Sequence, residues 1–451
     1  MSKKGKKLYV TFVDFKKAFD SVRHDKLIEY IRSQGIKGKF FAALSAMYKS
    51  LLSCIRVNGQ LSDFFECPVG VRQGCVLSPT LFSMFINQLA NHMNERGRHG
   101  VQLLPDIMEI FILLFADDVA LLSTTPAGLQ HQLNILQTCC DDMQLSVNIG
   151  KTKVMVFRKG GFLAKREQWF YKGTKLEVVN KYCYLGFNFT TKISTKMGTE
   201  HLVTKGKRAV VQLNKAFNRY KEMNAKAFFK IFDAKIQPIL LYSSEIWGLN
   251  RLEHIEKIHM MACKRFLGVP VRTPNKMVLG DLGRYPLYVN SCMNTLRYWL
   301  KLLHMDPNRL PYNAYQMLLQ LDRNGKECWA TKIREILCET GFNIVWLQQG
   351  VGDVKAFLRV FKQRLVDMFT QEWFGTIRDR ERYENYRSFK SIFEKEKYLH
   401  FINTYCFRVA VTQTRFNVLP LNNNVYRYSD NIQEKACPFC KTTVENEAHF
   451  Y

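Results

Sequence analysis

The sequence predicts an α+β fold in which an antiparallel sheet carries helices on one face and is followed by regions built from helices. Strand and helix patterns alternate over residues 1–190, whereas strand patterns stop after Thr190 and helical periodicity continues. An order of strand, helices, hairpin, helix and strand is typical of the split βαβ, or ferredoxin-like, arrangement. A chain of 451 residues is too long for one hydrophobic core, so several domains are expected.

Hydrophobic patterns set the limits of the elements expected before Thr190. The expected helices cover about residues 24–33, 40–52, 79–95 and 127–143. The expected strands cover about residues 8–13, 110–115, 119–122, 154–157, 176–179 and 182–189. A hairpin over residues 53–67 should turn at Asn58-Gly59, because this pair favours two-residue turns.

The second half of the chain reads as helical over residues 195–300 and 308–405. Prolines at 270, 274 and 286 interrupt the first stretch, so we expect residues 280–284 (Gly-Asp-Leu-Gly-Arg) to lie in a loop. The chain then divides into residues 1–190, a helical region over 191–305, a second over 306–432, and a short Cys/His element over 433–451.

The charge balance points to a polyanionic partner. The chain has 66 Lys and Arg against 39 Asp and Glu, a net charge of +27, and it is rich in aromatic residues. Nucleic acid is the best match for such a chain, and a membrane surface is the weaker alternative. The longest apolar run, residues 107–115, contains Glu109 and is too short to cross a bilayer. Thirteen cysteines without a secretory signal indicate a reduced, intracellular protein that is not secreted.

Three acidic residues stand at strand ends. Asp14 follows the strand expected over residues 8–13, and Asp117 and Asp118 lie at the tip of the following hairpin. Clustered carboxylates repel one another, and divalent cations relieve that repulsion. Mg²⁺ prefers oxygen ligands, and two such ions stabilise the attacking and leaving oxygens of phosphoryl transfer. The set therefore predicts a nucleotidyl-transfer site, although each aspartate alone is equally consistent with a turn.

Two further segments carry candidate binding residues. Arg72-Gln73-Gly74 lies in a loop where an unhindered backbone could approach a base pair or sugar. The Arg72 side chain could contact a phosphate or the template. Lys151 lies at a glycine-containing turn. The alternatives are an ordinary glycine turn and a solvated lysine.

A helix expected over residues 200–221 has two separate faces. At about 100° per residue, one stripe is cationic and the other apolar. The cationic stripe consists of Lys205, Arg208, Lys215 and Arg219, and the apolar stripe of Leu202, Ala209, Leu213, Ala216, Phe217 and Tyr220. This pattern indicates a helix docked on a core, with a face that could follow nucleic-acid phosphates without reading sequence. The alternative is a solvated helix face.

The C-terminal segment contains Cys437, Cys440 and His449. Two thiolates and an imidazole suit Zn²⁺, but a structural zinc site needs four ligands. The alternative is that these residues are unliganded.

These motifs resemble those of reverse transcriptases from non-LTR (LINE-type) retrotransposons, nearest to the jockey-like group. The matching segments, in family order, are residues 9–20 (YVTFVDFKKAFD), 71–79 (VRQGCVLSP), 115–118 (FADD), 148–153 (NIGKTK) and 182–186 (YCYLG). The resemblance implies a right-hand polymerase palm over residues 1–190, a thumb over 191–305 and a partial zinc knuckle at the end.

The resemblance also implies roles for individual residues. Asp14, Asp117, Asp118 and the Phe15 carbonyl would bind two Mg²⁺ or Mn²⁺ ions. Phe19 would be the steric gate that excludes a ribose 2′-OH by shape, within a nucleotide site that includes Arg72, Gln73 and Gly74. Without the resemblance, Phe19 reads as a core residue. Lys151 would protonate or neutralise the leaving pyrophosphate. The primer grip would be a hairpin that positions the primer 3′ end and comprises Tyr182, Tyr184, Leu185 and Gly186. Without the resemblance, two tyrosines in an edge hairpin indicate only sheet packing.

The implied partners are an RNA template, a DNA primer or target, and dNTPs, and the implied compartment is the nucleus. No pattern indicates an oligomeric state. The resemblance further implies truncation at both ends. Only thirteen residues precede Asp14, so Lys3, Lys4, Lys6 and Lys7 stand where a fingers subdomain is expected, and a fourth zinc ligand is expected beyond Tyr451.

Three functions follow from these patterns. The first is an RNA-directed DNA polymerase acting in target-primed reverse transcription. The second is a catalytically inactive nucleic-acid-binding remnant of such an element. The third is an RNA-binding helical region in the C-terminal half that assembles a ribonucleoprotein.

Overall fold

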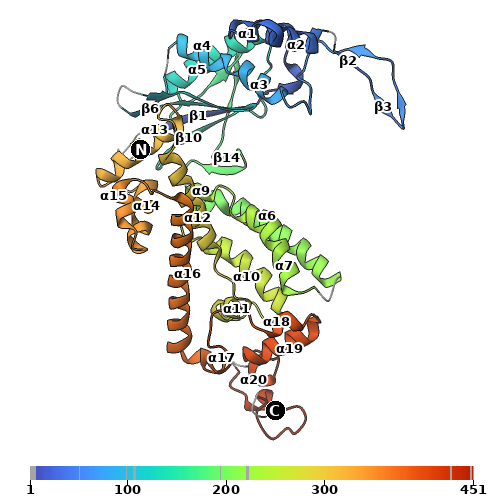
Figure 1. Ribbon diagram of the computed structural model, residues 1–451, viewed down its shortest axis with the longest axis vertical. Helices are drawn as coiled ribbons and strands as arrows, with labels where there is room; N and C mark the ends of the chain where they lie inside the picture. The colour runs from blue at the N-terminus through green and yellow to red at the C-terminus, as the bar shows by residue number, and fades with distance from the viewer. Residues whose placement is uncertain are drawn as a thin grey trace. The chain divides into compact units, whose positions relative to one another are not determined.

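The computed structural model describes residues 7–49, 51–97, 99–104, 108–192, 194–219, 223–426, 429–446 and 449. The chain separates into two compact units, Met1–Gly198 and Thr199–Tyr451 (Figure 1). The first unit contains the sheet and the second is helical. The finer division at residues 305 and 432 stays a prediction.

The first unit is built on a five-stranded sheet in the order β13-β10-β1-β9-β8. The strands are β1 (Leu8–Val13), β8 (Ile112–Phe115), β9 (Asp118–Ser123), β10 (Lys153–Phe157) and β13 (Glu177–Val178). The central strand β1 pairs antiparallel with both β9 and β10. Without β13, the order of the strands in the sheet is β10-β1-β9-β8. Counted along the chain, these are the fourth, first, third and second strands of this group. That is the split βαβ order, so the predicted α+β fold class is confirmed.

Both faces of β1 are buried, which explains its continuous apolar sequence. Tyr9 and Val13 face the larger core, which the helices cover, whereas Val10 and Phe12 face a smaller cluster. The smaller cluster is closed by the hairpin β14 (Lys181–Tyr184) and β15 (Phe187–Thr190). The strand pattern over residues 182–189 is thus divided into a hairpin, as expected for the segment that resembles a primer grip, because the chain reverses at Leu185 and Gly186, which have φ angles of 47° and 74°.

The helices of the first unit follow the amphipathic patterns closely. They are α1 (His24–Ser33), α2 (Gly38–Lys49), α3 (Ser78–Ile86), α4 (Gln88–Glu95) and α5 (Pro126–Met143). Helix α1 has the predicted limits. The helix expected over 40–52 ends earlier because Leu52 begins β2, and the helix expected over 79–95 is interrupted at Asn87. The Thr125 hydroxyl caps α5 by accepting a hydrogen bond from the Gly128 amide at 3.0 Å.

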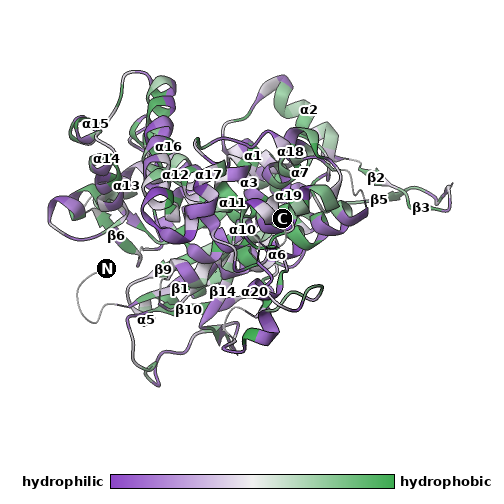
Figure 2. Cartoon of the chain, turned by 90° about the horizontal axis from the view of Figure 1, so that it is seen from below, coloured by the Kyte–Doolittle hydropathy of each residue, from purple (hydrophilic) through white to green (hydrophobic). Residues whose placement is uncertain are grey.

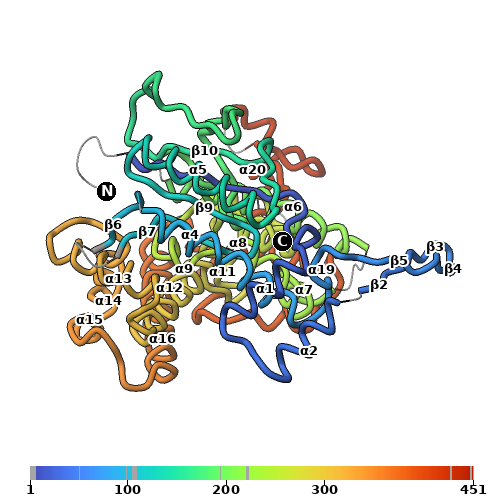
Figure 3. The backbone as a smooth tube through the Cα atoms, turned by 90° about the horizontal axis from the view of Figure 1, so that it is seen from above, coloured from blue at the N-terminus to red at the C-terminus, as the bar shows by residue number. Residues whose placement is uncertain are grey.

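A two-tiered hairpin connects α2 to the loop before α3 and projects from the unit (Figures 1 and 3). Its strands are β2 (Leu52–Ser53), β3 (Arg56–Val57), β4 (Gln60–Leu61) and β5 (Phe65–Glu66). It turns at Asn58 and Gly59, as predicted, with φ angles of 50° and 86°. The short pairs β6 (Val101–Leu104) with β7 (Met108–Ile110), and β11 (Phe170–Tyr171) with β12 (Thr174–Lys175), complete the unit. The strand expected over 110–115 is divided at Phe111 between β7 and β8.

The second unit consists mainly of helices joined by short connections. Its longer helices are α10 (Glu253–Leu267), α11 (Asn275–Leu282), α12 (Leu287–Leu303), α13 (Leu310–Arg323), α14 (Trp329–Glu339), α16 (Val354–Asp379) and α19 (Tyr405–Arg415). The shorter ones are α7 (Ala225–Ile231), α8 (Gln237–Leu240), α9 (Ser244–Trp247), α15 (Asn343–Gln348), α17 (Glu384–Phe389), α18 (Tyr398–Phe401) and α20 (Asn422–Val425). Helix α6 (Thr195–Arg219) begins at the end of the first unit.

The core of this unit gathers residues from α12, α13, α14 and α16. Trp299 is fully buried there and donates a hydrogen bond from Nε1 to the Tyr315 hydroxyl at 2.8 Å. Hydrophobic and hydrophilic residues alternate along α16 (Figure 2), so it buries one side, including Phe361 and Leu365, and exposes the other. No helix among the described residues combines the length and apolarity needed to cross a bilayer.

The loop expected at residues 280–284 is wrong, because α11 extends through Leu282. Proline is compatible with a position just before a helix, so Pro274 precedes α11 instead of breaking it. Gly283, with φ at 58°, ends the helix. Gly280 permits a close approach, because a Cβ there would lie 2.6 Å from the Tyr386 hydroxyl and 2.7 Å from the Trp373 ring.

Asp281 on α11 is the centre of a buried polar network. Its carboxylate is fully buried and accepts hydrogen bonds from the hydroxyls of Tyr386 and Tyr398, each at 2.9 Å. Arg415 donates to it from Nε at 3.2 Å and also pairs with Glu396 at 3.1 Å. Burial raises the pKa of Asp281, and the Arg415 charge opposes that shift. One carboxylate thus ties α11 to α17, α18 and α19.

Replacement of Asp281 by Ala should destabilise the helical unit by about 3–5 kcal/mol, because it removes one partner of a buried ion pair and the acceptor of two tyrosine hydrogen bonds. The matched control is Asp379→Ala, which removes an exposed pair with Arg378 and should leave stability almost unchanged, because water screens that pair. Urea unfolding followed by tryptophan fluorescence suits this test, since only Trp169 of the 6 tryptophans lies in the first unit. Equal losses in the two variants would contradict the assigned role of Asp281.

Candidate active site

Strand pairing brings the three predicted aspartates to one end of the sheet. Val13 pairs with Val119, so the next position along β1 sets Asp14 opposite Asp118. Phe115 pairs with Asp118 across the β8–β9 hairpin, which leaves Ala116 and Asp117 as the two turn residues. Asp14, Asp117 and Asp118 therefore lie on adjacent strand ends, as the sequence predicted.

Asp14 and Asp117 lie close enough to Asp118 to affect its ionisation. The pKa of Asp118 is raised by loss of hydration, and then by the negative charges of Asp117 and Asp14. Among the described residues, only the C-terminal Cys/His group brings three ligand atoms within 4.8 Å, so the three carboxylates stand further apart as a set. Carboxylates that repel one another across this corner of the sheet are oxygen donors of the kind that divalent cations bind.

Lys151 is the nearest cation to this group among the ion pairs of the described residues. Its Nζ lies 3.8 Å from Asp14 Oδ2, and its side chain is 71% exposed. The amine therefore reaches the carboxylates from the solvent side, where an incoming anion would also approach. The structure brings Lys151 to the site, and its catalytic role stays a prediction.

The turn that carries Lys151 also fixes the end of β1. The Asp14 amide donates to Thr152 Oγ1 at 3.2 Å, and the Asn148 amide donates to the Asp14 carbonyl at 2.7 Å. Phe15 forms an isolated bridge with Val147 in which its own N–H and C=O are not used. In extended antiparallel backbone these groups point to the opposite side, which is that of β9 and its aspartates. The Phe15 carbonyl is thus not used in the bridge to Val147, and its role as a metal ligand stays a prediction.

The sequence interpretation missed the positioning residues Thr152 and Asn148. Thr152 is almost fully buried, and its hydroxyl is the acceptor that holds the Asp14 backbone. Both residues lie in the segment 148–153 that carries Lys151. A polar residue next to a candidate lysine at a turn was the available signal, but the partner depends on strand pairing.

The predicted nucleotide residues also converge. The Val71 amide donates to the Phe19 carbonyl at 2.9 Å, and Gln73 Nε2 donates to Asp20 Oδ1 at 2.7 Å. The half-buried Phe19 ring stacks on Phe82 of α3 with 4.3 Å between ring centroids. The ring is thus held by the core but not enclosed by it, and its use as a steric gate stays a prediction.

The loop after Val71 keeps its backbone open. Gly74 has φ at 86°, a conformation that disfavours other residues, and a Cβ there would meet nothing within 4 Å. The Arg72 side chain is exposed, while its carbonyl accepts from the Ser78 hydroxyl at 2.6 Å. Both observations are consistent with a nucleotide-binding loop, and neither identifies the ligand.

The β14–β15 hairpin lies beside the aspartates. Tyr182 stacks on Phe12 with 4.4 Å between ring centroids, and Tyr184 lies 5.0 Å from the same ring. Burial, followed by the Asp118 charge, raises the pKa of Tyr184 to about 12. The pKa of Tyr182 is raised by burial and then by Asp14 and Asp118. The predicted primer-grip residues thus flank the carboxylates, and Leu185 and Gly186 form the turn.

Helix α6 has the two faces that the sequence predicted. Lys205, Arg208, Lys215 and Arg219 are all exposed, and no ion pair joins any of them to another described residue. The apolar stripe is buried at Leu202, Leu213 and Phe217 and half-buried at Ala209 and Ala216. Tyr220 lies outside the described residues.

The C-terminal Cys/His residues are also brought together. The ligand atoms of Cys437, Cys440 and His449 lie within 4.8 Å of one another. Cys440 Sγ is 3.3 Å from His449 Nε2. Hydrogen bonds from Thr442 and Thr443 lower the pKa of the exposed Cys440 thiol to about 5. A thiolate beside an imidazole is a suitable pair of ligands for a soft divalent metal.

Comparison with known proteins agrees with this geometry. Residues 1–189 match the family model described as reverse transcriptase (RNA-dependent DNA polymerase). This part of the chain therefore belongs to the reverse transcriptase family.

The relatives narrow the family further. The RNA-directed DNA polymerase from mobile element jockey of Drosophila melanogaster is 22% identical over 310 residues, which cover 66% of this chain and 32% of that protein. Its counterpart from Drosophila funebris is 23% identical, also over 66% of this chain and 32% of that protein. The probable RNA-directed DNA polymerase from transposon BS of Drosophila melanogaster is 24% identical over 64% of this chain and 32% of that protein. The resemblance to jockey-like polymerases is confirmed, and the chain spans about a third of the length of these relatives.

Among solved structures, the telomerase of Candida tropicalis in complex with a TWJ fragment of telomeric RNA aligns with 92% of this chain and 50% of that chain. The sequences are 12% identical and the TM-score is 0.33. Because that score is low, the fold assignment rests on the sheet topology and the family match.

The Cys440 thiol should be alkylated by iodoacetamide at a rate that is nearly flat between about pH 6 and 8, because a thiol with a pKa of about 5 is already ionised there. An ordinary exposed thiol reacts roughly tenfold faster per pH unit over the same range. Mass spectrometry of the C-terminal peptide provides the measurement. Thr443→Val should restore a rising profile, and Cys440→Ser should abolish the signal. A steep profile in the unmodified chain would contradict the assigned hydrogen bonds.

Proposed function

We propose that the chain is the catalytic part of an RNA-directed DNA polymerase that transfers a deoxynucleotide to a primer 3′-hydroxyl in target-primed reverse transcription. The observation that carries this proposal is the meeting of Asp14, Asp117 and Asp118 at adjacent strand ends, with Lys151 at 3.8 Å from Asp14. Membership of residues 1–189 in the reverse transcriptase family supports the reaction class.

The chemistry is divided among the residues already described. Asp14, Asp117, Asp118 and the Phe15 carbonyl would hold two Mg²⁺ or Mn²⁺ ions, which supply activation of the primer hydroxyl and neutralise triphosphate charge. Lys151 would protonate the departing pyrophosphate or neutralise its negative charge. Its exposure allows it to approach an anion without displacing the carboxylates.

Substrate selection is assigned to the loop and the aromatic ring beside it. Phe19, held by its stack on Phe82, would exclude a 2′-hydroxyl by contact with the sugar. Gln73 and Gly74 would present open backbone to the base pair, and Arg72 would contact a phosphate or the template. The turn at Tyr184, Leu185 and Gly186, with Tyr182, would position the primer end.

Helix α6 supplies a surface for the nucleic acid itself. Its cationic stripe, which forms no ion pair with a described residue, would contact phosphates of the RNA template and the DNA primer, and this contact contributes affinity without sequence preference. A reaction primed by target DNA would take place in the nucleus.

Cys437, Cys440 and His449 would hold Zn²⁺ with one further ligand, and bound Zn²⁺ would protect Cys440 from the alkylation described above until a chelator is added.

Primer extension on an RNA template tests the reaction. With a DNA primer, dNTPs and Mg²⁺ or Mn²⁺, Asp117→Asn should lower extension by more than about 100-fold, because it removes a carboxylate from the charged group that the reaction needs. The control is Asp142→Asn, an exposed aspartate on α5 that lies away from the strand ends, and it should leave extension unchanged. Extension by Asp117→Asn at the unmodified rate would refute the assigned site. Template binding without extension by the unmodified chain would identify a catalytically inactive binding protein instead.

Replacement of Phe19 by Val should admit ribonucleotides, because a smaller side chain leaves room for the 2′-hydroxyl. The expected result is that the ratio of dNTP to rNTP incorporation falls by at least about tenfold. Phe82→Leu is the matched variant that loosens the stack but keeps the Phe19 ring, and it should change the ratio less. An unchanged ratio in Phe19→Val would remove Phe19 from the sugar site.

A further inference from the structure

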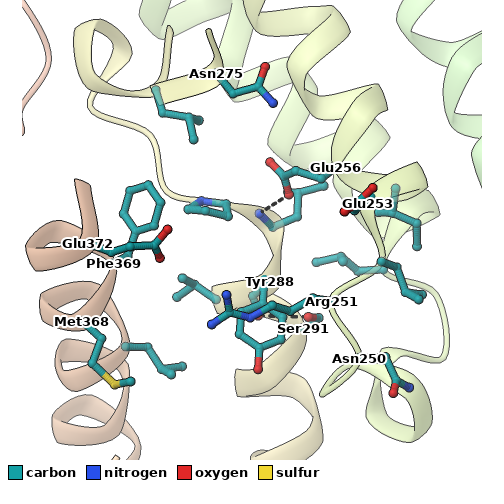
Figure 4. A pocket seen from close by; sticks show the side chains of 18 of the residues that line it. Asn250, Arg251, Glu253, Glu256, Asn275, Tyr288, Ser291, Met368, Phe369 and Glu372 are labelled. Carbon is teal, nitrogen blue, oxygen red and sulfur yellow. Dashed lines mark hydrogen bonds between the residues drawn. The ribbon is translucent and has the colours of Figure 1, made fainter. Parts of the chain in front are cut away.

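A pocket of about 470 Å³ lies within the second unit and has no part in the proposed polymerase chemistry. It is bounded by α10, α11, α12 and α16, with Met368, Phe369 and Glu372 on one side and Asn250, Arg251 and Glu253 on the other (Figure 4). Its walls are mostly apolar and include Trp247, Ile255, Leu279 and Leu365. Water is poorly accommodated against such walls, so the pocket favours an apolar occupant.

The charged residues that line this pocket are mainly acidic, whereas the chain as a whole is basic. Four glutamates line it against Arg251 and Lys276, whereas the whole chain carries a net charge of +27. Two of the glutamates are engaged within the unit. Glu256 accepts from the Leu287 amide at 2.9 Å and contacts His259 at 2.7 Å, and Glu372 pairs with Lys276 at 2.8 Å.

The other two glutamates remain available. Glu253 and Glu339 are exposed, and neither forms an ion pair with a described residue. The two cations are already occupied in part, since Arg251 lies 5.0 Å from the centroid of the Tyr288 ring and Lys276 lies 4.6 Å from that of Phe369. The pocket therefore offers a free negative potential beside an apolar cavity.

This combination excludes the ligand that the rest of the chain favours. A phosphate backbone would be repelled by Glu253 and Glu339, so nucleic acid is a poor occupant. A ligand that fits must bury an apolar group and carry positive charge next to it. Large apolar side chains with flanking Lys or Arg provide that chemistry in a peptide.

We propose that this pocket binds a short segment of a protein partner, which inserts one large apolar side chain between α10, α12 and α16. A Lys or Arg beside that side chain would pair with Glu253 and Glu339. The site would recruit a partner independently of the reaction at Asp14, Asp117 and Asp118.

Fluorescence anisotropy with three labelled peptides tests the proposal on the full chain. Their central sequences are Arg-Leu-Phe-Lys, Glu-Leu-Phe-Glu and Arg-Ala-Ala-Lys. The basic apolar peptide should bind, despite the positive net charge of the chain. It should bind about tenfold more weakly to the double variant Glu253→Gln with Glu339→Gln, since two charge pairs are lost. The control Glu335→Gln, an exposed glutamate on the same helix as Glu339 but outside the pocket, should leave affinity unchanged.

A second variant tests the cavity itself. Met368→Trp should fill part of it and abolish binding of the basic apolar peptide, while primer extension stays at the unmodified rate. The proposal is overturned if that peptide does not bind, if Arg-Ala-Ala-Lys binds equally well, or if the double variant binds within twofold of the unmodified chain. Displacement of the peptide by short single-stranded RNA would assign the pocket to nucleic acid and overturn it as well.

Discussion

The pairing of β1 with β9 is the constraint on which the candidate active site depends. Residues of both strands are deeply buried, so their register is held by packing on two faces of the sheet. That register sets Asp14 opposite Asp118 and leaves Asp117 in the turn. Three like charges would separate in a flexible segment, because repulsion opposes their approach. Stiff, buried strands keep them together, which is the geometry that a cation site needs.

The second face of the sheet contributes more than packing. The β14–β15 hairpin covers Phe12 with Tyr182 and Tyr184, and burial, followed by the nearby aspartate charges, raises the pKa values of both tyrosines. A segment far along the chain is thus coupled to the carboxylates electrostatically as well as through contact. The turn at Asn148–Thr152 acts on the other side of β1 through hydrogen bonds to the Asp14 backbone. The site is therefore supported by two elements from the end of the first unit.

The helical unit relies on buried charges of two kinds. Asp281 is compensated by Arg415 and by two tyrosine hydroxyls. Arg408 is fully buried without a carboxylate partner among the described residues, and it lies 4.1 Å from the Phe266 ring centroid. Burial removes water from the guanidinium and lowers its pKa to about 10. Attraction between the guanidinium and the aromatic ring face offsets part of that lost hydration. Asp281 and Arg408 thus each connect segments of the helical unit that are distant in sequence.

The sequence alone determined the α+β class, the limits of α1, the turn at Asn58-Gly59, the exposed stripe of α6 and the identity of the three aspartates. These depend on local periodicity and on residue types that are restricted by turn geometry or charge. The tertiary structure decided that residues 280–282 are helical and that Thr152 holds Asp14. Each of these depends on contacts between segments distant in sequence, such as Tyr386 against Gly280, which no local pattern encodes. The acidic pocket has the same origin, since its walls come from α9, α10, α11, α12, α14 and α16.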